Sequence, residues 1–87
     1  MKRDIPDLML KLADLLERHG EESWGAALRH LLLEYETEPI VAKAKIRHLY
    51  GGMGSFNDVI LQDRNGPLGN KNDELDSLRS DLFSACE

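Results

Sequence analysis

The stretch Leu49-Tyr50-Gly51-Gly52-Met53-Gly54-Ser55-Phe56-Asn57-Asp58 decides how this chain folds. Three glycines fall within four residues, between an aromatic–apolar pair and a short polar run. Glycine loses more backbone entropy on folding than any other residue, so a cluster implies a tight turn, a close backbone approach or a binding loop. We expect a helix to end at Gly51, and Phe56 to fold inward as the next element begins.

Apolar residues on both sides of this stretch recur at spacings of three and four, which predicts amphipathic helices. The expected helices span about residues 5–19, 22–36, 39–50 and 72–85. Asp4 is placed to cap the first helix and Gly20 to end it. Pro39 suits the first turn of the third helix, and Asn72 suits the cap of the fourth.

Residues 55–62 fit two local structures. Ser55 and Asp58 resemble the cap of a short helix, whereas Val59, Ile60 and Leu61 resemble a short strand. We favour a short helix or turn, with a strand pair within 56–67 as the alternative. The polar residues 63–72 are expected to form a loop. The prediction is a single mainly α domain over 1–87: a compact bundle of three to four helices with a glycine-rich loop after the third.

The amino-acid composition limits the classes of function that this chain can have. The chain has 11 Lys and Arg against 16 Asp and Glu, a formal net charge of −5. This balance argues against nucleic-acid binding, which needs phosphate neutralisation, and suits a basic protein partner. The lone cysteine, Cys86, fits a cytoplasmic protein without disulfides. No apolar run reaches the ~18 residues of a membrane span. A chain this small has a modest core, so a homodimer would bury more apolar area.

The glycine-rich stretch supplies the candidate binding residues. They are Gly51, Gly52, Met53, Gly54, Ser55, Asn57 and Asp58. Backbone N–H groups in such a loop can hold an anion. The known phosphate fingerprints are nevertheless incomplete, because no lysine follows the glycines and Asn57 stands where a dinucleotide turn has its third glycine. The alternative is structural, with the glycines only turning the chain onto the preceding helix.

The sequence shows no catalytic set, metal site or cofactor motif. His19, His30 and His48 fall on different predicted helices, and none is four residues from another histidine as a helical metal pair would be. An enzyme is the weakest of three hypotheses. A hydrolase would need a base near Ser55 or Asp58, and His48, seven residues before Ser55, is the only candidate nearby.

Residues 49–61 resemble a family of short, uncharacterised bacterial proteins that share a GGMGSFND-like signature after two or three helices. Residues 72–83 look like the closing helix of that family, so that the resemblance covers roughly Trp24 to Phe83. It implies a bacterial origin and a compact, mainly helical fold. The family has no established activity, so the resemblance implies no catalytic residues.

Small size, acidity and an unusual loop favour a protein-interaction or regulatory module, of the kind represented by immunity proteins and antitoxins. An acidic inhibitor of this type can cover a basic surface of its target. The alternative is a small ligand- or anion-binding domain that uses the loop from Gly51 to Ser55.

Overall fold

Four helices and a short strand pair form the described part of the chain, residues 4–51 and 55–87 of a computed structural model. The mainly α fold is therefore confirmed. The helices are α1 (Ile5–Arg18), α2 (Glu22–Thr37), α3 (Pro39–His48) and α4 (Gly69–Ala85). A 3-10 turn (Phe56–Asp58) and strands β1 (Gln62–Asp63) and β2 (Gly66–Pro67) connect α3 to α4. The predictions made for Gly52, Met53 and Gly54 lie outside the described residues.

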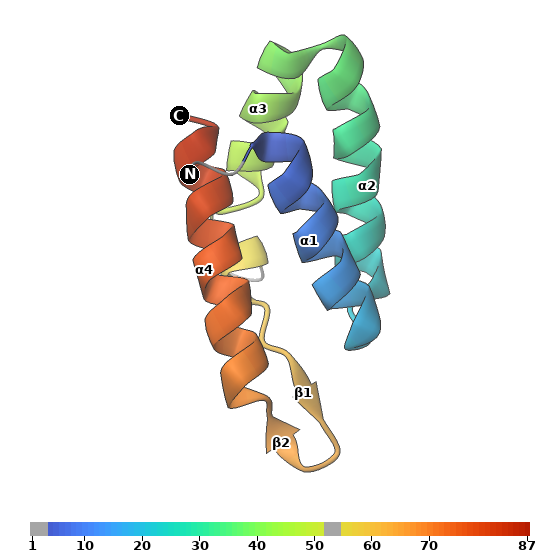
Figure 1. The fold of residues 1–87 in the computed structure, drawn as a ribbon, viewed down its shortest axis with the longest axis vertical. Helices are drawn as coiled ribbons and strands as arrows, with labels where there is room; N and C mark the ends of the chain where they lie inside the picture. Colours follow the sequence, from blue (N-terminus) through green and yellow to red (C-terminus); the bar gives the residue numbers. More distant parts are fainter. Residues whose placement is uncertain (1–3, 52–54) are drawn as a thin grey trace.

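Helix α1 lies between two other helices (Figure 1). It packs antiparallel to α2 on one side and against α4 on the other, while α3 folds back along α2. The antiparallel β1–β2 hairpin lies at the end of the molecule opposite the α2–α3 corner. The bundle measures 41 × 28 × 22 Å. Chain segments on both sides of the glycine-rich stretch are therefore held by this bundle.

Local sequence determines where α1 begins and ends. The central position of α1 in the bundle explains why so many of its residues are apolar. The backbone N–H of Asp7 donates to Oδ1 of Asp4 at 2.8 Å, the predicted N-terminal cap. Gly20 follows the helix with φ +85°, a conformation that glycine adopts without a steric penalty. The side chains that α1 buries against its neighbours are Ile5, Leu8, Met9, Leu12, Ala13, Leu15 and Leu16.

A buried glycine lets α1 and α2 approach closely. A Cβ atom on Gly25 would lie only 2.5 Å from Cγ of Glu17. The Glu17 carboxylate accepts two hydrogen bonds from Arg29, at 2.8 and 2.9 Å. These hydrogen bonds lower the pKa of Glu17. The small residue at position 25 thus leaves room for an ion pair between the two helices.

Two predicted helix boundaries are wrong. Helix α3 ends at His48 with Leu49 as its C-cap, so Gly51 does not terminate it. Helix α4 begins at Gly69, three residues before Asn72, and the loop expected at 63–72 is replaced by part of the hairpin and the first turn of α4. Asn72 does not cap the helix, because its side chain forms hydrogen bonds with the backbone of a distant segment. Its Oδ1 accepts from the Leu61 N–H at 2.7 Å, and its Nδ2 donates to the Leu61 carbonyl at 2.9 Å.

We expect Asn72→Ala to lower the free energy of unfolding by about 2 kcal/mol. Two hydrogen bonds to a partly buried backbone are lost at roughly 1 kcal/mol each, and the higher helix propensity of alanine offsets only a fraction of that loss. Urea denaturation followed by circular dichroism measures the change. Asn70→Ala is the matched control, since Asn70 is exposed in the same turn. Equal stability of the two variants would show that the Asn72–Leu61 clamp contributes nothing.

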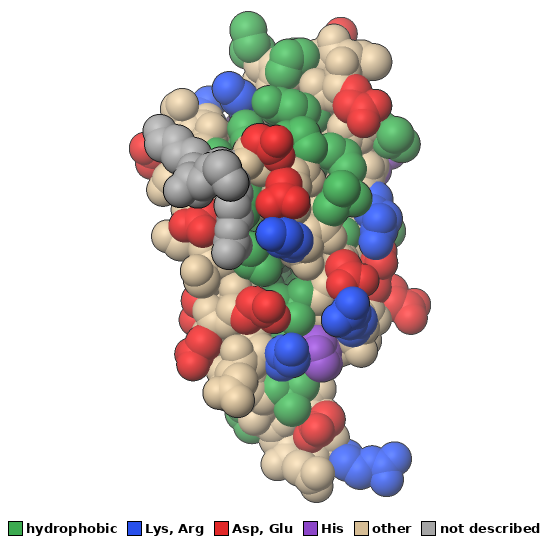
Figure 2. Space-filling view, viewed as in Figure 1, with side chains coloured by type: hydrophobic (Ala, Val, Ile, Leu, Met, Phe, Trp, Pro, Cys, Tyr) green, Lys and Arg blue, Asp and Glu red, His purple; other side chains and the backbone are tan. Residues whose placement is uncertain are grey.

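Charged side chains of both signs alternate over the face shown in Figure 2, and hydrophobic side chains gather in its upper half, where α2 meets α3. The large apolar residues with substantial exposure are Leu10, Leu33, Ile40, Val41 and Ile60. Ile40, which follows Pro39 at this corner, is the most exposed of them at 83%.

Candidate functional site

The segment after the glycines runs through the protein core. Phe56 is fully buried, as its sequence position predicts, and its ring stacks on Trp24 with centroids 5.1 Å apart. Tyr50 meets the same ring edge-on at 5.5 Å and also contacts Phe83 at 5.0 Å. Aromatic pairs of this geometry add to the free energy of burial. Four aromatic rings, from α2, the turn after α3, the 3-10 turn and α4, therefore fix this segment.

A buried arginine holds the 3-10 turn from the side of α4. Arg79 is only 7% exposed. Its guanidinium donates to the carbonyls of Phe56 and Val59 and to the carboxylate of Asp76. Its central carbon also lies 5.7 Å from the centroid of the Phe56 ring. The planar, multi-donor guanidinium suits this role because it can serve several acceptors at once.

Three further hydrogen bonds join the end of α3 to the turn and to α4. The Phe56 N–H donates to the Leu49 carbonyl, and the Asn57 side chain donates to the Tyr50 carbonyl, both at 2.8 Å. The Tyr50 hydroxyl donates to the Arg79 carbonyl at 2.8 Å. Burial raises the pKa of Tyr50, so the hydroxyl keeps the proton that it donates. The segment from 55 to 59 is therefore a fixed part of the scaffold.

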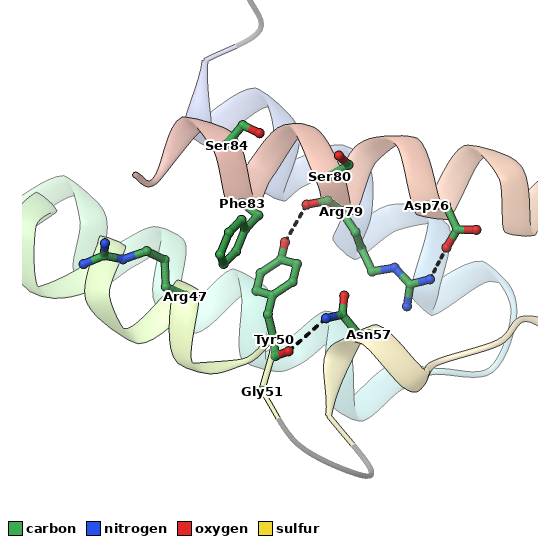
Figure 3. A pocket seen from close by; sticks show the side chains of 9 residues that line it. All are labelled: Arg47, Tyr50, Gly51, Asn57, Asp76, Arg79, Ser80, Phe83 and Ser84. Atoms are coloured by element: carbon green, nitrogen blue, oxygen red, sulfur yellow. Dashed lines mark hydrogen bonds and ion pairs between the residues drawn. The ribbon is translucent and has the colours of Figure 1, made fainter.

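A groove lies between α3 and α4, on one side of this segment (Figure 3). It has a volume of about 600 Å³. Tyr50 and Phe83 lie side by side within it, with Arg47 toward one end and Asp76 toward the other. The residues that line this α3–α4 groove are Arg47, Tyr50, Gly51, Asn57, Asp76, Arg79, Ser80, Phe83 and Ser84. An aromatic floor with Arg47 at one end and the Asp76–Arg79 ion pair at the other is suited to binding an extended, mixed-polarity group.

A second groove, of about 450 Å³, involves the other residues of the same segment. We call it the Trp24 groove. Its lining residues are Glu21, Trp24, Ser55, Asp58, Val59, Ile60, Gln62 and Pro67. They include two carboxylates and no basic side chain. Electrostatically, the Trp24 groove thus differs from the α3–α4 groove, which has two arginines.

The structure divides the predicted binding residues between these two grooves. Gly51 and Asn57 line the α3–α4 groove, whereas Ser55 and Asp58 line the Trp24 groove. The predicted side-chain cap at Ser55 is wrong. The Ser55 hydroxyl makes no capping hydrogen bond and has no partner among the described residues. Its backbone carbonyl instead accepts from the Asp58 N–H, which closes the turn.

Sequence reasoning missed the residues that α4 contributes, Arg79 above all. One signal was available. Leu75, Arg79 and Leu82 follow the spacing of four and three that places residues on one helical face. A charged residue on a stripe of buried leucines needs hydrogen-bond partners inside the fold. The spacing does not reveal that those partners are the carbonyls of Phe56 and Val59.

The residues considered for catalysis are not brought together. His48 is exposed on α3 and does not line the groove that contains Ser55. Cys86 is buried, and burial raises the pKa of its thiol despite the nearby positive charges of Lys43 and Arg47. Across residues 4–51 and 55–87, no group of three His, Cys, Asp or Glu side chains is placed to hold a metal ion. In the same residues, no helix has the length and apolar character needed to cross a membrane.

The helices and the two grooves beside the 3-10 turn define a small, mainly helical domain. A family model described as a domain of unknown function (DUF6966) matches residues 17–69, and the chain belongs to this family. The matched region includes α2, α3, the 3-10 turn and the hairpin, and it ends where α4 begins. Arg79 and Asn72, which hold the turn from α4, lie beyond it. No curated protein and no solved structure matches the chain.

Proposed function

We propose that this chain is a protein-interaction module, and that the α3–α4 groove receives a segment of its protein partner. The observation that carries the proposal is the composition of the groove, in which two aromatic side chains lie between an arginine and a carboxylate. Protein interfaces concentrate binding energy on aromatic and arginine side chains surrounded by polar groups. An apolar side chain of the partner would rest on Tyr50 and Phe83.

Arg47 is the residue best placed to select the partner. Within the described part of the chain its guanidinium has no hydrogen bond or ion pair, and it extends from α3 at one end of the groove. The other arginine of the groove, Arg79, is fully engaged with the 3-10 turn. A carboxylate on the partner, near its apolar anchor, would satisfy Arg47 through paired hydrogen bonds.

The rigidity of the groove supports the same proposal. Its floor is held by the hydrogen bonds of Tyr50 and Asn57 and by the buried Phe56. A preformed site loses little conformational entropy when a partner binds. Because the chain as a whole carries a net charge of −5, long-range attraction favours a partner that is basic overall. A cytoplasmic immunity- or antitoxin-like role is the specific form of regulation that we propose.

We expect Arg47→Glu to reduce capture of the partner at least tenfold. The substitution places a carboxylate where the partner's carboxylate would bind, and like charges at an interface cost binding free energy. Tagged full-length chain is used as bait in a lysate of the source organism, with quantitative mass spectrometry of the bound proteins. Arg64→Glu, in the exposed hairpin turn, is the control because it makes the same change in net charge.

Ser84→Trp provides a second, uncharged test, since the added ring would occupy the groove. A protein retained by wild type and Arg64→Glu but lost with both groove variants supports the proposal. If no protein shows that pattern, the groove is not a protein-binding surface.

The alternative, an anion-binding domain, is favoured by one observation: Arg47 and the side-chain amide of Asn57 line the groove together with the backbone of Gly51. Thermal-shift measurements with inorganic phosphate and nucleotides test it. A rise in melting temperature that disappears in Arg47→Glu and persists in Arg64→Glu would favour the anion-binding domain over the protein-interaction module.

A further inference from the structure

The Trp24 groove has the chemistry of a site for a positively charged side chain. Glu21 provides a carboxylate, Asp58 adds a second one although it already makes an interaction within the protein, and none of the eight lining residues is Lys, Arg or His. A cation in this groove would therefore meet attraction without a competing charge from the lining.

The indole of Trp24 is a second element of this site. Phe56 covers part of the Trp24 surface, and Trp24 is only partly buried. The indole also lines the groove, where a cation can be attracted by its π electrons. Val59, Ile60 and Pro67 add apolar surface against which the aliphatic part of a long side chain can pack.

The hydroxyl of Ser55 is an independent observation that points to a ligand. Ser55 is 9% exposed and lines the groove, and its Oγ has no hydrogen-bond partner among residues 4–51 and 55–87. Buried hydroxyl groups in proteins are nearly always hydrogen-bonded. The oxygen itself is closed off from solvent, so an N–H donor in the groove would supply the missing partner once the Ser55 side chain turns toward it.

We propose that the Trp24 groove binds an arginine side chain of the protein partner. Arginine fits better than lysine, because its planar guanidinium can lie against an indole and still donate to carboxylate and hydroxyl oxygens around its edge. This inference rests on the proposed protein-interaction function and adds the chemistry of the partner: an exposed arginine on a surface that is basic overall.

The test uses N-acetyl-arginine amide as probe and its neutral analogue N-acetyl-citrulline amide as control, each titrated into the full-length chain. Trp24 is the only tryptophan, so its fluorescence reports directly on the groove. We expect saturable binding of the arginine probe with a dissociation constant on the order of 1 mM, typical of so small a ligand. The citrulline probe should bind at least fivefold more weakly.

Two pairs of variants locate the site. Glu21→Gln removes a lining carboxylate and should weaken the arginine probe at least threefold, whereas Glu22→Gln, an exposed neighbour outside the lining, should leave its affinity unchanged. Gln62→Lys adds a positive charge to the groove and should weaken binding at least fivefold. Its control is Asn65→Lys in the hairpin turn.

Equal affinity for arginine and citrulline probes, or equal effects within the pairs of variants, would overturn the inference. Failure here is separable from failure of the proposed function. Arg47→Glu alters only the α3–α4 groove and should leave probe binding unchanged, while partner capture through that groove is measured without the probe.

Discussion

Arg79→Met is expected to lower the free energy of unfolding by about 3 kcal/mol, because two buried carbonyls lose the guanidinium as a donor at roughly 1–3 kcal/mol each. These carbonyls belong to Phe56 and Val59, and no other side chain among the described residues donates to them. The Phe56 carbonyl keeps one long hydrogen bond, from the Val59 N–H at 3.4 Å. Methionine retains much of the aliphatic volume, so the loss reports mainly on hydrogen bonds. A domain of this size has a total stability of only about 4–13 kcal/mol.

Urea denaturation of wild type and variants measures this effect. Arg64→Met is the matched control and should change stability by less than about 0.5 kcal/mol, as surface substitutions do. Asp76→Asn should also cost little, since the Asp76 side chain is 67% exposed and its loss leaves Arg79 bound to both carbonyls. Arg79→Lys should fall between, because an ammonium group cannot reproduce the guanidinium fork. A loss below 1 kcal/mol for Arg79→Met would mean that water replaces the arginine at the two carbonyls.

Phe56→Ala is expected to destabilise the protein by about 3–5 kcal/mol, the usual cost of removing a fully buried aromatic ring. Phe56 is the point where Trp24, Tyr50 and Arg79 meet, so its removal leaves a cavity lined by all three. Thermal unfolding followed by circular dichroism measures the loss. The emission of Trp24 should change as well, even at temperatures where the variant remains folded, because its stacking partner is gone.

Phe83→Ala is the comparison for this prediction. Among the ring contacts of the described residues, Phe83 meets only Tyr50, and its side chain is partly exposed. Its truncation should therefore cost clearly less than that of Phe56. Similar losses for the two variants would contradict the central position that the structure assigns to Phe56.

Phe56→Ala and Arg79→Met also affect the two grooves. Phe56 and Arg79 hold the segment whose residues line both the α3–α4 groove and the Trp24 groove. Variants that test binding, such as Arg47→Glu and Glu21→Gln, change residues outside this support. Loss of binding in those variants can therefore be separated from loss of the fold by measuring their thermal stability in parallel.

Much of the fold could be predicted from sequence because its signals are local. The cap at Asp4, the left-handed Gly20 and the position of Pro39 act within one or two helical turns, and the structure has helix ends at each of them. The inward position of Phe56 could also be predicted, since the residues around it are polar or glycine and the helices before it each present an apolar face. The ranges that we expected for the first three helices agree with α1, α2 and α3 to within two residues.

Tertiary contacts decided the remaining features. Asn72 resembles a helix cap in sequence, but its side chain binds the Leu61 backbone, eleven residues away. Ser55 resembles a cap as well, but its side chain makes no capping hydrogen bond. The turn is instead stabilised from α4, where Arg79 donates to the Val59 carbonyl. A polar side chain can satisfy either nearby or distant backbone groups, and only the packing of the helices determines which are within reach. For the same reason the glycine-rich stretch predicted one binding loop, whereas the fold places the described residues around it in two separate grooves.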